Sequence, residues 1–101
     1  MKAFRVQNAK NLILCLININ SLRRKFYELA PVLYEGLVDI LAICETKIDD
    51  SFPASQFAIP DYKFYRQDRS HNAGGVLIYI RGDIAHKVCK DFEDLSDDKY
   101  I

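Results

Sequence analysis

Residues 12–23 read LILCLININSLR, and residues 38–47 read VDILAICETK. In each stretch an apolar run, at residues 12–17 or 38–44, ends abruptly in polar residues. A buried parallel strand reads as a continuous apolar run, and in open α/β sheets ligands bind just beyond the carboxyl ends of the strands. Asn18 and Glu45 directly follow the two runs, so they are the first candidates for a functional site.

The stretch between the two runs predicts an amphipathic helix. Its apolar residues recur at three- and four-residue steps, namely Leu22, Phe26, Leu29, Leu33 and Leu37. Ser21 or Asn20 is expected to cap its start, Pro31 to kink or restart it, and Gly36 to end it. A right-handed strand–helix–strand crossover places both strand ends on the same edge of the sheet, which predicts that Asn18 and Glu45 are near neighbours.

The remaining sequence predicts further elements of one unit without repeats. Residues 46–58 read as a polar loop, residues 62–65 as a short strand and residues 76–80 as a third apolar strand. Residues 70–74 read as a turn, and residues 86–92 as the start of another strand. The Gly74-Gly75 pair lacks the spacing of a Walker or Rossmann phosphate loop, so a tight turn whose tip approaches a ligand is the better interpretation.

The composition is that of a globular chain without a strong electrostatic bias. Half of the 101 residues are hydrophobic, 28% are charged, and 14 basic residues balance 14 acidic ones. A zero net charge argues against a protein that coats nucleic acid nonspecifically, but it is compatible with a local DNA-binding patch. The length suffices for one domain with a modest core.

The cysteines and the first residues favour an intracellular chain without a membrane anchor. Cys15, Cys44 and Cys89 are an odd set without Cys-x-x-Cys spacing, and two of them lie in the apolar runs, where cysteine acts as a small hydrophobic residue. The run at residues 12–17 is shorter than a secretory h-region and no small-residue cleavage site follows it. No stretch approaches the ~20 apolar residues of a membrane span.

Taken in order, these motifs resemble the endonuclease/exonuclease/phosphatase superfamily, which includes apurinic endonucleases and DNase I. The narrower resemblance is to the endonuclease domain of non-LTR (LINE-type) retrotransposons of the jockey kind. It runs from about residue 11 to about residue 87 and also rests on Asp49-Asp50-Ser51-Phe52, on YRQDR at residues 65–69 and on NAGGV at residues 72–76. A single motif would be weak, whereas the ordered series is fairly specific.

This resemblance implies an α/β fold, the N-terminal half of a DNase I-like four-layer sandwich of two β-sheets flanked by helices. The family's second half carries a catalytic Asp, a nearby Asn and a terminal Ser-Asp-His, and nothing after residue 87 resembles these. His71 and His86 lie too early to be that histidine. We expect residues 1–10 to be an N-terminal lead and residues 11–101 a truncated domain, inactive as an isolated chain.

The same resemblance assigns Glu45 as a ligand of Mg²⁺, with Mn²⁺ as a substitute, and Asn18 as a catalytic residue that orients phosphate or metal-bound water. Mg²⁺ keeps several waters and is often held by one or two carboxylates plus substrate phosphate. Asn20 stands where apurinic endonucleases tend to carry Asp, and it is predicted as a weaker second metal contact. Without the resemblance, Glu45 would be a solvated loop residue and Asn18 a turn former.

Three basic residues, Lys47, Arg66 and Arg69, are predicted to contact DNA phosphates, since Lys and Arg supply much of nonspecific DNA affinity and Arg binds phosphate bidentately. For Arg66 and Arg69 a solvated surface position is an equally good interpretation of the sequence. Asp68, between these arginines, is expected to order the loop rather than to take part in chemistry.

For the complete domain, the resemblance implies Mg²⁺-dependent hydrolysis of a DNA phosphodiester bond. In the retrotransposon branch, one strand of chromosomal DNA is nicked in the nucleus to prime a downstream reverse transcriptase. Two alternatives stay open: a superfamily phosphatase acting on inositol phosphates or sphingolipids would share Asn18 and Glu45, and a decayed element fragment would retain only binding capacity.

Overall fold

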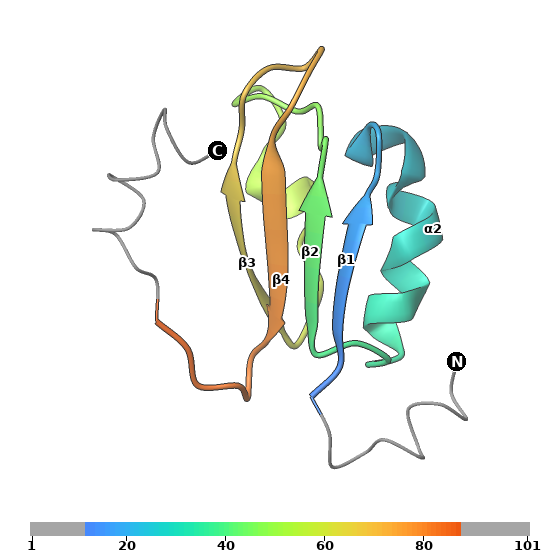
Figure 1. Ribbon diagram of the computed structural model, residues 1–101, viewed down its shortest axis with the longest axis vertical. Helices are drawn as coiled ribbons and strands as arrows, with labels where there is room; N and C mark the ends of the chain where they lie inside the picture. Colours follow the sequence, from blue (N-terminus) through green and yellow to red (C-terminus); the bar gives the residue numbers. More distant parts are fainter. Residues whose placement is uncertain (1–11, 88–101) are drawn as a thin grey trace.

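The computed structural model describes residues 12–87 as a four-stranded mixed sheet with a helix packed on it. The elements in chain order are β1 (Leu14–Asn18), α2 (Leu22–Tyr34), β2 (Ile40–Cys44), the 3-10 turn η1 (Ala54–Gln56), β3 (Tyr62–Gln67) and β4 (Val76–Arg81). The strands lie side by side in the order β1-β2-β4-β3 (Figure 1). This arrangement confirms the predicted α/β class.

Strands β1 and β2 are parallel, with Leu14 opposite Ile40 and Asn18 opposite Cys44. Their carboxyl ends therefore meet on one edge, as the crossover argument predicts. Both strands begin two residues later than expected. Just before β2, the side chain of the buried Asp39 replaces regular strand pairing, because its Oδ2 accepts a hydrogen bond from the N–H of Ile13 at 2.7 Å. Strand β4 pairs antiparallel with β2 and β3, so the β3–β4 turn returns to the same edge (Figure 1).

Helix α2 buries its predicted apolar face, with Leu22, Leu29 and Leu33 inside the core. The expected side-chain cap is wrong: Ser21 occupies the N-cap position with φ 91° but makes no capping hydrogen bond. Its own N–H donates to the carbonyl of Glu45 at 3.0 Å, so the entry to the helix is tied to the loop after β2.

The end of α2 is a glycine-dependent Schellman motif. Gly36 has φ 67°, its N–H donates to the carbonyl of Leu33 at 2.9 Å, and the N–H of Leu37 donates to Val32 at 3.2 Å. The expected restart at Pro31 is wrong, because one helix runs through this residue to Tyr34. The carbonyl of Pro31 accepts from the N–H of Glu35 at 3.0 Å, so the helical hydrogen-bond pattern resumes after the single N–H that proline lacks.

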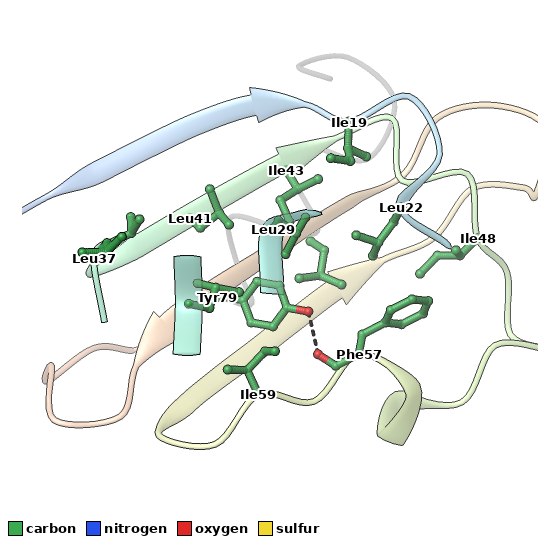
Figure 2. Close-up of a cluster of buried hydrophobic side chains, with 13 residues drawn as sticks. Ile19, Leu22, Leu29, Leu37, Leu41, Ile43, Ile48, Phe57, Ile59 and Tyr79 are labelled. Carbon is green, nitrogen blue, oxygen red and sulfur yellow. Dashed lines mark hydrogen bonds between the residues drawn. The ribbon is translucent and has the colours of Figure 1, made fainter. Parts of the chain in front are cut away.

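The core lies between α2, η1 and one face of the sheet (Figure 2). The segment predicted as a polar loop contributes to it, since Ile48 and Phe57 are fully buried. Tyr79 donates its hydroxyl hydrogen to the carbonyl of Phe57 at 2.6 Å, a bond drawn in Figure 2, and burial raises the pKa of Tyr79. The 46–58 segment is therefore packed against the sheet, and this packing determines where its polar residues reach the surface.

The opposite face of the sheet is apolar and open to solvent in the described part of the chain. Alternate strand residues are exposed on it, from 73% at Leu16 to 37% at Ile78. Of the further strand expected at residues 86–92, only the first two residues are described, and they are not part of a strand; the rest lies outside the described residues. Among residues 12–87, no helix is long and apolar enough to cross a membrane.

Candidate functional site

Three segments converge at the edge where β1 and β2 end: the loop after β1, the loop after β2 and the β3–β4 turn (Figure 1). The N–H of Ile19 donates to the carbonyl of Cys44 at 3.0 Å, which extends the β1–β2 pairing past Asn18. Asn18 is exposed and Glu45 is half-buried. The shared edge predicted for Asn18 and Glu45 is confirmed, while the chemical roles of the two side chains stay predictions.

Four residues other than glycine have a left-handed backbone at this edge: φ is 47° at Asn20, 91° at Ser21, 57° at Glu45 and 54° at Lys47. Such a conformation costs about 1–3 kcal/mol per residue and persists only where surrounding contacts impose it. Here the N–H of Lys47 donates to the carbonyl of Gly74 at 2.9 Å, and Ser21 is bonded to Glu45. Backbone strain of this kind clusters at functional sites. Within residues 12–87, Asp61 is the one other non-glycine residue with positive φ, so most of this strain lies at this edge of the sheet.

The Glu45 carboxylate is held by backbone, and no cationic side chain of the described part of the chain pairs with it. Its Oε2 accepts a long hydrogen bond from the N–H of Gly74, at 3.4 Å. Within residues 12–87, no Lys, Arg or His forms an ion pair with Glu45. A half-buried carboxylate without a counter-charge, fixed at a strand end, suits a bound cation.

Asn20 and Lys47 interact with each other across the same edge. The ammonium of Lys47 donates to Oδ1 of Asn20 at 2.5 Å. This hydrogen bond occupies the amide oxygen that a metal would need, so it competes with the metal contact predicted for Asn20. It also places the Lys47 charge beside the loop after β1, where a phosphate bound at the edge would meet it.

The donor set at the edge fits Mg²⁺ better than Zn²⁺. No group of three or more His, Cys, Asp or Glu side chains gathers around one point in the described part of the chain. Zn²⁺ requires such a group, whereas Mg²⁺ accepts one or two carboxylates together with waters and substrate oxygens. Glu45 alone meets the protein's share of that requirement.

Arg66 has a structural role that the sequence did not reveal. Its Nε and Nη2 donate to Asp68 in a two-point ion pair, and its Nη1 and Nη2 donate to the carbonyls of Phe52 and Asp49, both at 2.8 Å. Only 17% of its side chain is exposed. The expectation that Asp68 orders this loop is confirmed. Arg66 connects β3 to the loop after β2 through these hydrogen bonds. A phosphate contact by Arg66 stays a prediction.

Arg69 is placed quite differently. It is exposed, and no ion pair or hydrogen bond joins it to another residue within 12–87. Its aliphatic stem packs over the turn, where a Cβ added to Gly74 would lie 2.6 Å from the Cδ of Arg69. This guanidinium is free for a phosphate, beside the residue that contacts Glu45.

Asp49, Ser51 and His71 form a cluster that sequence reasoning missed. Oδ1 of Asp49 accepts from the N–H and the hydroxyl of Ser51, at 3.0 and 2.5 Å, and Oδ2 lies 3.2 Å from Nδ1 of His71. The hydrogen bonds from Ser51, and then the neighbouring His71, hold the pKa of Asp49 below its ordinary value. The Asp-x-Ser spacing signals this turn, but no sequence pattern connects it to His71.

Thr46 is a second residue that the sequence did not single out. It is fully buried between Glu45 and Lys47, and its hydroxyl has no hydrogen-bond partner among the described residues. Its N–H donates to the carbonyl of Gly75 at 3.3 Å. Thr46 therefore joins the two loops that carry the site.

A hollow of about 370 Å³ lies at the other end of the sheet, lined by Asp61, Arg81, Gly82 and Asp83. Arg81 in this hollow is paired with Asp39 and with Asp83, both at 3.1 Å. Because the charge of Arg81 is paired and the hollow lies where β2 begins, this hollow is not the candidate site.

Two solved structures resemble the described fold. An AP endonuclease from Archaeoglobus fulgidus matches with a TM-score of 0.58 and 31% sequence identity, over 68% of this chain and 27% of that chain. The 3′ phosphatase NExo from Neisseria, bound to product DNA hairpin, matches with a TM-score of 0.59 and 25% identity, over 69% of this chain and 27% of that chain. No protein-family model and no curated protein matches the sequence.

This chain thus spans about a quarter of the length of each enzyme that it resembles. The fold in the matched region is DNase I-like: a mixed α/β arrangement with a four-stranded sheet and a helix. Both similar structures are of DNA-processing enzymes.

Proposed function

We propose that this DNase I-like chain is the N-terminal half of a Mg²⁺-dependent phosphodiesterase domain that nicks DNA. The observation that carries the proposal is the meeting of Asn18 and Glu45 at the ends of two neighbouring parallel strands, on an edge held in strained backbone. The similarity to an AP endonuclease and to a 3′ phosphatase bound to DNA supports a nucleic-acid phosphoester as the substrate.

In this proposal each group at the edge has one task. Glu45 holds the cation, which when bound supplies positive charge to the phosphate and to the developing transition state. Asn18 orients the phosphate through its side-chain amide. Lys47 and Arg69 contact phosphates of the bound strand, and the His–Asp pair that activates water belongs, by the family resemblance, to the second half of the domain.

The more specific part of the proposal is that the chain belongs to the endonuclease domain of a non-LTR retrotransposon. It rests on the ordered motifs, in particular Asn20 in place of an acidic residue and the segments at residues 49–52, 65–69 and 72–76. In that branch the substrate is chromosomal DNA, the partner is a downstream reverse transcriptase and the site of action is the nucleus.

The similarity to a 3′ phosphatase makes removal of a terminal phosphate the second candidate function. Both reactions use a cation and an orienting amide, so Glu45 and Asn18 do not distinguish them. The distinguishing readout is the substrate: relaxation of supercoiled plasmid reports phosphodiester cleavage, and release of phosphate from a 3′-phosphorylated oligonucleotide reports phosphatase activity.

The test uses this chain joined to the C-terminal part of the Archaeoglobus AP endonuclease. Mg²⁺-dependent plasmid nicking is expected, and Glu45→Gln is expected to lower it by about two orders of magnitude or more without affecting folding. Glu28→Gln changes an exposed carboxylate on α2 and serves as the matched control. Nicking by the Glu45→Gln protein at the level of the control would contradict the metal role of Glu45.

A further inference from the structure

His71 and Asp49 link the β3–β4 turn to the loop after β2. The 3.2 Å contact between Nδ1 and Oδ2 joins residues that are 22 positions apart in the chain. His71 is 64% exposed, whereas the side chain of Asp49 is 31% exposed. Most of the His71 imidazole thus faces solvent, while its Nδ1 is held by the carboxylate of Asp49.

Asp49 is itself anchored through both its side chain and its backbone. Its carboxylate accepts two hydrogen bonds from Ser51, and its carbonyl accepts from Nη2 of Arg66 at 2.8 Å. An ionised carboxylate only accepts, so Nδ1 of His71 is the donor in their contact. The Nε2 on the other side of the ring has no partner among the described residues, and in the imidazolium form it is a second donor.

The turn that carries His71 is fastened to the candidate site. Three residues further on, Gly74 donates its N–H to Glu45 and accepts from the N–H of Lys47. The hydroxyl of Ser70 accepts from the N–H groups of Asn72 and Ala73, at 3.2 and 3.1 Å, which fixes the turn around His71. His71 therefore stands at the strand-end edge on a turn with a defined shape.

We propose that His71 is a phosphate-binding residue of this edge, with Asp49 as the positioning residue that aims it at the DNA backbone; this inference rests on the proposed function. Histidine changes its charge between about pH 5 and 8, and its imidazolium attracts phosphate. The charged groups around the pair are Asp49 itself, Arg66 with its partner Asp68, and the free Arg69. Arg66 is largely buried and paired with Asp68, whereas the imidazole of His71 is 64% exposed, so His71 and Arg69 are the groups of the turn that can reach an anion.

The test measures binding of the 101-residue chain to a short DNA duplex by fluorescence anisotropy, at about pH 5.5 and about pH 8. The variant is His71→Gln. His86→Gln is its matched control, because the other described histidine is bonded to Tyr65 and to the carbonyl of Ile84, and the two variants change the overall charge equally.

At the acidic pH, His71→Gln is expected to weaken binding several-fold and to reduce the salt-dependence slope by about one, as loss of one phosphate contact does. At the basic pH, the affinity of His71→Gln for the duplex is expected to equal that of the unmodified chain. The affinity of His86→Gln is expected to equal that of the unmodified chain at both pH values. Asp49→Asn is expected to reproduce part of the acidic-pH loss, whereas Asp49→Glu, which keeps a carboxylate that can accept from Nδ1 of His71, is expected to restore binding.

Equal pH dependence of the two histidine variants would overturn the inference. If Arg69→Gln weakens binding while His71→Gln does not at either pH, this inference is wrong and the proposed function stands. If the unmodified chain binds no DNA even at low salt, both are wrong.

Discussion

A Cβ atom added to Gly75 would lie 2.3 Å from the hydroxyl oxygen of Thr46, so the buried Thr46 side chain fills the space beside this glycine. Gly75 also has φ 94°, a conformation that favours glycine. The glycine pair thus lets the β3–β4 turn dock closely on the loop that carries Glu45.

This contact predicts a loss of stability in Gly75→Ala from two sources. The left-handed backbone costs about 1–2 kcal/mol for a non-glycine residue, and the clash with Thr46 adds about 1–3 kcal/mol. Gly36→Ala separates these two contributions, because Gly36 has φ 67° but a Cβ there would meet only Nη1 of Arg81, at 4.0 Å, without a clash. Urea unfolding is expected to show the larger loss for Gly75→Ala; equal losses would contradict the docking role of Gly75.

Arg66, near the end of β3, and Arg69, just after this strand, are expected to differ in what they affect. Arg66→Gln breaks charge-assisted hydrogen bonds to three residues and is expected to lower the free energy of unfolding by about 2 kcal/mol. Arg69→Gln is expected to change it by less than about 0.5 kcal/mol, and instead to weaken DNA binding and reduce its salt slope. Unfolding curves and salt titrations measure the two effects, and the opposite assignment would refute both roles.

The Asp49 cluster predicts a specific pH response. The Ser51 hydroxyl is the largest cause of the lowered pKa of Asp49, so Ser51→Ala is expected to raise that pKa towards its ordinary value. A carboxyl group with a lowered folded-state pKa stabilises the protein above its unfolded-state pKa, near 4, and this stabilisation is lost as the pH falls through the folded-state value. Carboxyl NMR titration checks the shift; an unchanged Asp49 titration in Ser51→Ala would contradict it.

The open sheet face predicts association of the isolated chain. Leu16 is 73% exposed, and exposed apolar faces bind apolar dyes and other protein surfaces. Leu16→Lys is expected to reduce dye binding and self-association while the sheet is retained. Leu41→Lys, on the buried face of β2, is expected to unfold the chain. If Leu16→Lys leaves dye binding unchanged, the face is covered in solution.

Much of the fold follows from local patterns in the sequence. Continuous apolar runs identify β1, β2 and β4, and the spacing of leucines in α2 together with Gly36 gives the helix and its end. The Ser21 side-chain cap and the restart at Pro31 were wrong, because backbone hydrogen bonds to Glu45 and along the helix replace the expected local interactions. The burial of Ile48 and Phe57 was missed because a loop of polar composition carries isolated anchors without periodicity.

The candidate site was predictable only in part. The position of Asn18 and Glu45 on one edge follows from the parallel crossover. The contacts of Arg66 with the carbonyls of Phe52 and Asp49, and of His71 with Asp49, depend on how separate segments pack together, and no spacing rule encodes that packing. The left-handed backbone at Glu45 and Lys47 was also hidden, since neither residue type favours it.

The most direct test of the central claim, that Glu45 holds a divalent cation at the strand-end edge, is a titration of the ¹⁵N-labelled chain with Mn²⁺ as a paramagnetic substitute for Mg²⁺. We expect the amide signals of Asn18, Glu45 and Gly74 to broaden first, with this broadening lost in Glu45→Gln and kept in Glu28→Gln. Broadening centred on another carboxylate such as Asp83, or unchanged in Glu45→Gln, would contradict the account.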